Sequence, residues 1–128
     1  MAAPGTVTRR ILVVDDDPLV ADSIRRMLEF DGHQVELAAD AEEALALFSR
    51  QSFDLTLVDY EMPKMKGDQL AAALKAILPS RPIVMFTGYA ESVRATIGNS
   101  SGVDVILGKP FDLDELRRTL TGLFPEDS

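Results

Sequence analysis

The sequence predicts a doubly wound α/β fold, in which a five-stranded parallel sheet carries helices on both faces. Two observations support this prediction. Short apolar segments alternate five times with segments of helical periodicity along the chain, an order typical of parallel sheets covered by helices. In addition, the run from Leu12 to Val14 shows no alternation of polar and apolar residues, as expected for a strand buried on both faces.

The predicted elements occupy nearly the whole chain. The strands are the apolar, β-branched segments Arg10–Val14, Gln34–Ala38, Leu55–Val58, Ile83–Phe86 and Val103–Leu107. The helices are Pro18–Phe30, Ala41–Gln51, Gly67–Leu78, Glu91–Ile97 and Leu113–Leu123. Right-handed crossovers leave few topologies for such a chain, and the flavodoxin-like strand order 2-1-3-4-5 is the leading one.

Residues typical of helix ends support these boundaries. Asp17 fits an N-cap because proline follows it at the first helical position. Further signals are the capping-box pairs Asp40 with Glu43 and Asp112 with Glu115, and Gly32 as a left-handed helix terminator. The fourth helix has the weakest pattern, because the Gly- and Ser-rich segment Gly98–Gly102 cannot continue it.

Composition limits the possible classes of protein. The chain has 128 residues, of which 46% are hydrophobic, enough for one domain with a real core. It has no cysteine, which excludes disulfides, thiolate zinc sites and cysteine nucleophiles. Its formal charge of −8 argues against direct binding of nucleic acid. No apolar run approaches the roughly 18 residues of a membrane span, and we expect a cytoplasmic domain at 10–124, with a flexible leader at 1–9 and a tail at 125–128.

Reactive side chains follow four of the five predicted strands, at the carboxyl end of each. The first strand ends in Asp15 and Asp16, the third in Asp59, the fourth in Thr87 and the fifth in Lys109. In an open α/β sheet, ligands bind beyond these ends, where the strand order reverses. The sequence therefore predicts a site at this edge of the sheet.

The chemistry of these groups favours phosphoryl transfer. The first and third strands are neighbours in the predicted order, so Asp15, Asp16 and Asp59 should lie close together. Carboxylates at such distances repel unless a cation neutralises them, and a few oxygen ligands with open positions suit Mg²⁺ better than Ca²⁺. Thr87 would add a hydroxyl donor and Lys109 an ammonium. The metal and the lysine would neutralise the oxygens of a phosphoryl group while one carboxylate attacks phosphorus.

Each of these residues also has a purely structural interpretation. Asp17 is best explained as a helix cap alone, and a single lysine such as Lys109 is most often a surface charge. His33, the only histidine, is expected to be an exposed residue at a strand edge rather than a catalyst. The convergence of complementary groups at four strand ends is what favours a site.

Four stretches of the chain resemble the receiver domain of two-component response regulators. They are residues 11–18 (ILVVDDDP), 54–63 (DLTLVDYEMP), 85–88 (MFTG) and 108–111 (GKPF), together with Gly67. The resemblance runs from about Arg10 to Leu123. It implies a signalling module, not an enzyme, that accepts a phosphoryl group from a histidine kinase or a histidine phosphotransfer protein and changes its affinity for a downstream partner.

The resemblance also implies a role for each site residue. Asp59 would be the phospho-acceptor, and Thr87 and Lys109 would contact the phosphoryl oxygens. The Mg²⁺ ligands would be Asp16 directly, Asp15 mainly through water, Asp59, and the backbone carbonyl of Glu61. The peptide bond between Lys109 and Pro110 is expected to be cis, an isomer that proline makes accessible.

Three features depart from the usual receiver pattern. Ile106 stands where receivers commonly carry Tyr or Phe, so signalling through Thr87 and the segment after it is expected in place of an aromatic ring flip. The segment Gly98–Gly102 is the expected mobile part. Glu61 and Tyr89 occupy positions beside the pocket that tune dephosphorylation in the family, with a sign that the sequence does not give.

Other functions compete with this interpretation. Asp15 and Asp17 after an apolar strand mimic the first motif of haloacid-dehalogenase-like phosphatases, although that fold needs more chain and a cap. A receiver-like scaffold that takes no phosphate is a third class, and a flavin phosphate would be repelled by the Asp-rich loop. The chain is expected to be either a stand-alone receiver or a piece of a longer protein such as a hybrid histidine kinase.

Overall fold

A computed structural model describes residues 7–97 and 102–125. Its five parallel strands have the order β2-β1-β3-β4-β5, which confirms the predicted topology. The strands are β1 (Arg10–Val14), β2 (Gln34–Ala38), β3 (Leu55–Asp59), β4 (Ile83–Thr87) and β5 (Val105–Gly108). The helices are α1 (Pro18–Phe30), α2 (Ala41–Arg50), α3 (Gly67–Ile77), α4 (Ala90–Ile97) and α5 (Leu113–Leu123).

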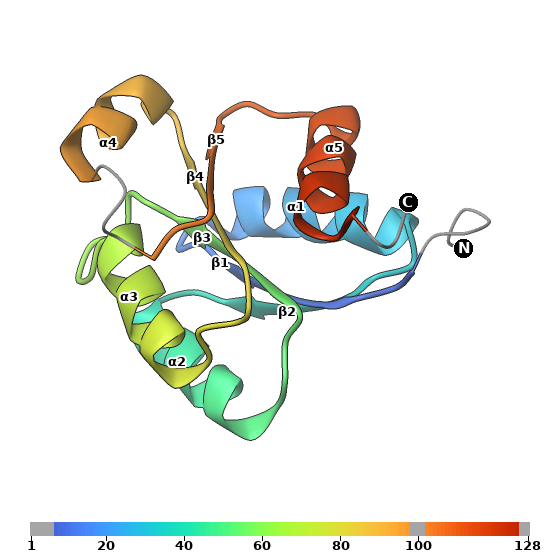
Figure 1. The fold of residues 1–128 in the computed structure, drawn as a ribbon, viewed down its shortest axis with the longest axis horizontal. Helices are drawn as coiled ribbons and strands as arrows, with labels where there is room; N and C mark the ends of the chain where they lie inside the picture. Colours follow the sequence, from blue (N-terminus) through green and yellow to red (C-terminus); the bar gives the residue numbers. More distant parts are fainter. Residues whose placement is uncertain (1–6, 98–101, 126–128) are drawn as a thin grey trace.

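Two hydrophobic layers cover the sheet, with α1 and α5 on one face and α2 and α3 on the other (Figure 1). Successive residues of β1 serve opposite layers: Ile11 and Val13 pack in the layer with α1 and α5, and Leu12 and Val14 pack in the layer with α2 and α3. All four side chains are fully buried. The absence of polar alternation in this strand therefore has the cause inferred from the sequence.

Element boundaries differ from the predicted ones by a residue or two. β3 and β4 each extend one residue further, to Asp59 and Thr87, which still pair with Phe86 and Gly108 of the neighbouring strands. The predicted start of the fifth strand at Val103 is wrong, because β5 begins at Val105. Just before it, the Asp104 carboxylate accepts a hydrogen bond from the backbone N–H of Ile83 at 2.8 Å. The expected mobile segment Gly98–Gly102 lies outside the described residues except for Gly102.

The helix caps largely follow the prediction. The Asp17 carboxylate accepts a hydrogen bond from Leu19 N–H at 3.0 Å, and Asp112 forms a reciprocal capping box with its partner three residues later. Gly32 has a φ of 90°, a left-handed conformation suited to glycine. The reciprocal box predicted at Asp40 is wrong in one half, since the Glu43 carboxylate accepts from the N–H of Ala39, not Asp40.

The expectation that His33 is exposed is also wrong. Its exposed fraction is 7%, and its Nδ1 accepts a hydrogen bond from the backbone N–H of Arg9 at 3.0 Å. Its backbone N–H donates to the carbonyl of Leu28 in the turn that ends α1 at 3.2 Å, and the residue is buried although β2 is an edge strand. No helix among residues 7–97 and 102–125 is long and apolar enough to cross a membrane.

Candidate functional site

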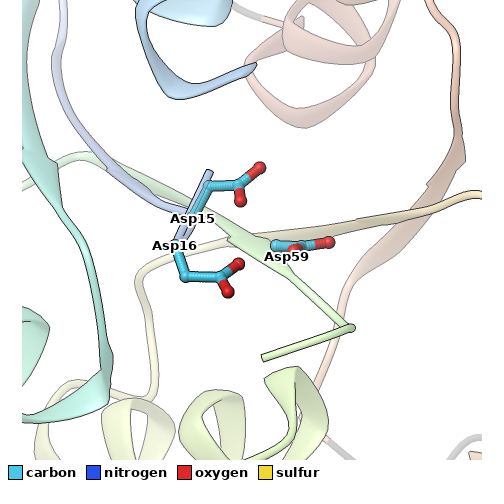
Figure 2. A group of neighbouring side chains, drawn as sticks. All are labelled: Asp15, Asp16 and Asp59. Atoms are coloured by element: carbon cyan, nitrogen blue, oxygen red, sulfur yellow. The ribbon is translucent and has the colours of Figure 1, made fainter. Parts of the chain in front are cut away.

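Three aspartates meet at the carboxyl ends of β1 and β3. These strands are adjacent, with Val14 opposite Val58, so the residues that follow them emerge side by side. One carboxylate oxygen from each of Asp15, Asp16 and Asp59 lies within 4.8 Å of the others, and the three side chains extend toward the same space (Figure 2). Asp15 and Asp59 are buried, whereas Asp16 is exposed.

Burial and crowding make the ionised state of these acids costly. Burial, followed by the charge of Asp15, raises the pKa of Asp59 to about 7. Burial likewise raises the pKa of Asp15. One Asp15 oxygen accepts from Asp17 N–H at 2.9 Å, but the other, Oδ2, is buried without a hydrogen-bond partner among the described residues. Such an orphaned oxygen beside two further carboxylates fits a hard divalent cation.

Lys109 brings a positive charge next to Asp59. Its Nζ lies 3.1 Å from Asp59 Oδ1, and its own backbone N–H donates to the carbonyl of Thr87 at 2.8 Å. The peptide bond between Lys109 and Pro110 is cis, as predicted. Because the ammonium of Lys109 contacts Asp59, a positive charge is available there to neutralise an incoming anion, whereas the neighbouring carboxylates would need a cation to offset their repulsion.

Thr87 is fully buried at the end of β4, and its hydroxyl has a partner that the sequence did not predict. It donates to the side-chain carboxylate of Glu61. Burial raises the pKa of Glu61, but the hydrogen bonds with Thr87 and Asp59 outweigh it and leave that pKa below its ordinary value. The sequence signal for this contact is an acidic residue two positions after Asp59, a position expected to lie beside the pocket but with no predicted side-chain partner.

Gly67 fixes the loop between β3 and α3 close to the site. Its N–H donates to the carbonyl of Tyr60 at 3.2 Å. A Cβ at this position would lie 2.6 Å from the carbonyl oxygen of Asp59, closer than real contacts allow. Glycine is therefore required here for close approach of two backbone segments. From the sequence, Gly67 was identified only as part of the receiver-like motif.

Known response regulators are similar to this chain over most of its length. The response regulator MprA of Mycobacterium sp. strain KMS is 38% identical over 119 residues, which make up 93% of this chain and 52% of that protein. The response regulator MprA of Mycobacterium bovis strain BCG / Pasteur 1173P2 is 37% identical over 123 residues. The chain thus spans about half the length of the curated relatives it matches.

Solved structures with the same fold cover the chain almost completely. The CheY-like receiver domain protein of Methanospirillum hungatei JF-1 has a TM-score of 0.86 and 34% identity, covering 94% of this chain and 97% of that one. The response regulator TrrA of Thermotoga maritima, solved with Mg²⁺ and beryllofluoride, has a TM-score of 0.82 and 31% identity, covering 91% and 99%. The phosphatase and scaffold alternatives gain no support from these relatives.

The family model of the response regulator receiver domain matches residues 11–121. That range includes the three clustered aspartates, Thr87 and Lys109. It also spans all five strands except the first residue of β1. The chain belongs to the receiver domain family of two-component response regulators and has a signalling role.

Proposed function

We propose that Asp59 accepts a phosphoryl group from a histidine kinase or a histidine phosphotransfer protein. The observation that supports this most is the setting of its buried carboxylate, which has an ammonium at 3.1 Å and two further carboxylates within 4.8 Å. A lone buried aspartate would be destabilised by that crowding. Crowded charges of this kind are typical of a functional site, in which a carboxylate nucleophile reacts beside a cation and a metal site.

The proposed transfer is a displacement at phosphorus. An Asp59 oxygen forms the new O–P bond while the P–N bond to the donor histidine breaks, and the bonding pair returns to the imidazole. Lys109 neutralises charge on the transferred group, and the Thr87 hydroxyl donates to one of its oxygens. We propose that Asp15, Asp16, Asp59 and the Glu61 carbonyl hold Mg²⁺, which supplies further charge neutralisation when bound.

The test is phosphorylation by a small acyl phosphate, followed by intact-mass measurement. The wild-type protein with Mg²⁺ should gain one phosphoryl group, and Asp59→Asn should gain none. Asp54→Asn is the matched control, because Asp54 directly precedes β3 and so lies at the opposite end of the strand from Asp59. An adduct that persists in Asp59→Asn would refute Asp59 as the acceptor.

The same proposal includes the bounds of the domain, its cellular location, its catalytic scope and its switch. We expect a receiver unit at 10–124, with 1–9 as leader and 125–128 as tail, acting in the cytoplasm, where kinases draw on ATP. The domain should promote only its own phosphorylation and dephosphorylation. Catalytic release of phosphate from external esters would instead favour the haloacid-dehalogenase-like alternative. The expected switch runs through Thr87, without an aromatic ring at Ile106.

A further inference from the structure

The Glu61 side chain occupies the space between the proposed acceptor and Thr87. Its carboxylate accepts the hydrogen bond from the Thr87 hydroxyl, and its backbone N–H points to Asp59 Oδ1 at 3.4 Å. Its second oxygen, Oε2, is buried and has no hydrogen-bond partner among residues 7–97 and 102–125. An anion of this chain thus already stands where a phosphoryl oxygen would meet Thr87.

The Thr87 hydroxyl can serve only one of these two acceptors. A hydroxyl carries a single proton and donates one hydrogen bond at a time. Its oxygen also accepts the backbone N–H of Tyr89 at 3.1 Å, which fixes the direction left for the proton. A phosphoryl group on Asp59 would therefore have to take this donor away from Glu61.

On the basis of the phospho-accepting function above, we propose that the Glu61 carboxylate competes with the phosphoryl group for Thr87 and thereby restrains loading of Asp59. Two effects act in the same direction. The hydrogen bond from Thr87 to Glu61 must break, and a second anion must enter a pocket that already holds the Glu61 charge, where partial burial strengthens repulsion. Glu61 is a positioning residue that acts through Thr87.

The test measures binding of beryllofluoride, a phosphoryl analogue, in the presence of saturating Mg²⁺. Glu61→Gln keeps the acceptor oxygen but removes the charge, so its affinity should rise about threefold. Glu61→Ala removes both and should bind about tenfold more tightly, a change of about 1.4 kcal/mol. Glu91→Gln, which removes one exposed acidic charge from α4, is the matched control and should bind as the wild type does.

A second readout separates competition from a general structural effect. The amide of Tyr89 reports on the Thr87 hydroxyl, to which it donates. In ligand-free protein its NMR resonance should move in Glu61→Ala toward the position that beryllofluoride produces in the wild type, and Glu61→Gln should show a smaller shift. Thr87→Val should abolish the difference between Gln and Ala at position 61, because no hydroxyl remains to be shared.

The outcomes distinguish this inference from the proposed function. Equal or weaker beryllofluoride binding in both Glu61 variants would overturn the competition and leave Asp59 as acceptor. An equal gain for Gln and Ala would also overturn it, because charge repulsion alone would then explain the effect. Absence of beryllofluoride binding in wild type and variants alike would overturn both the phospho-accepting function and the inference.

Discussion

Aspartate side chains have opposite electrostatic surroundings at the two ends of the sheet. At the amino end, Asp54 accepts from the backbone N–H of Arg10 at 2.9 Å and pairs with Arg81 at 3.3 Å. Asp104, just before β5, pairs with Lys75 at 2.8 Å. Each of these aspartates has a cation of its own, so its charge is balanced where it stands.

At the carboxyl end, the described residues place one lysine against a cluster of three aspartates. Lys109 contacts Asp59, Asp15 keeps an orphaned oxygen, and burial raises the pKa of both acids. The amino end is arranged for stability, whereas the carboxyl end keeps an unbalanced charge that a ligand can relieve. Unbalanced groups of this kind cluster at functional sites, and the contrast can be measured residue by residue.

The largest effect is expected from Gly67→Ala, which tests how tightly the carboxyl end is built. The new methyl group would meet the Asp59 carbonyl oxygen at 2.6 Å, so the β3–α3 loop must shift. We expect a loss of about 3 kcal/mol in the free energy of unfolding, measured by urea denaturation. Gly122→Ala is the control, because open space surrounds that helical glycine; it should stabilise by about 0.5 kcal/mol. Equal effects of the two substitutions would contradict the close approach at Gly67.

A cation should remove the imbalance at the carboxyl end. Mg²⁺ that binds only the folded state at a hundredfold excess over its dissociation constant stabilises by about 2.7 kcal/mol. We expect Mg²⁺ to raise the Tm of the wild type and to have little effect on Asp16→Ala. Asp40→Ala, at the N-cap of α2, is a control that should keep the Mg²⁺ response. The same Mg²⁺ shift in Asp16→Ala and the wild type would place the ion elsewhere.

At the amino end of the sheet, removal of an aspartate should destabilise the fold. Asp54→Ala leaves the N–H of Arg10 without its side-chain acceptor and Arg81 without its carboxylate. Because both partners remain partly exposed to water, we expect a loss of about 1.5 kcal/mol in urea denaturation. A neutral or stabilising result would show that this end is no better balanced than the other.

The opposite sign is expected for Asp59→Asn in the absence of divalent cations. Removing a buried charge beside Asp15 should stabilise the fold by about 1 kcal/mol at pH 8. In the wild type, folding raises the Asp59 pKa from about 3.9 to about 7, so the folded state holds more protons between these values. Stability should fall as pH rises through that range, and the fall should be smaller in Asp59→Asn. Identical pH profiles would refute the crowding.

Much of this contrast follows from the sequence, because it depends on local rules. Apolar runs without alternation specify buried strands, and the residues after Val14 and Val58 must emerge together once those strands are neighbours. The side-chain capping hydrogen bonds of Asp17 and Asp112 act within one helical turn. The fold class was therefore predictable. The strand order, and with it the grouping of Asp15 with Asp59, was predicted as the leading one of a few topologies and was supported by the resemblance to receivers.

The features that escaped prediction depend on side chains that meet across the chain. The Glu61 carboxylate reaches Thr87 because of the course of one loop and one rotamer, over a sequence separation of 26 residues. His33 is buried at a place where its ring accepts a hydrogen bond from the backbone of Arg9, 24 residues earlier in the chain. Neither outcome follows from periodicity or local capping, since both depend on how the packed elements lie relative to each other.

The smallest effect is expected at the ion pair between Asp31 and Arg117, which joins the end of α1 to α5 at the amino end of the sheet. Two hydrogen bonds, at 2.8 and 2.7 Å, hold the carboxylate to the guanidinium and lower the pKa of Asp31. A lowered pKa means that the pair stabilises the fold above the unfolded-state pKa of about 3.9 and that this stability is lost as pH falls through the lower folded value. The Arg117 side chain is 44% exposed, so solvent screening keeps the contribution below those of the preceding substitutions. Asp31→Asn should therefore lower the Tm slightly at pH 7 and by less at pH 2.5, with Arg118→Ala as a control that changes little at either pH. A Tm difference that grows toward low pH would show that Asp31 is not balanced by Arg117.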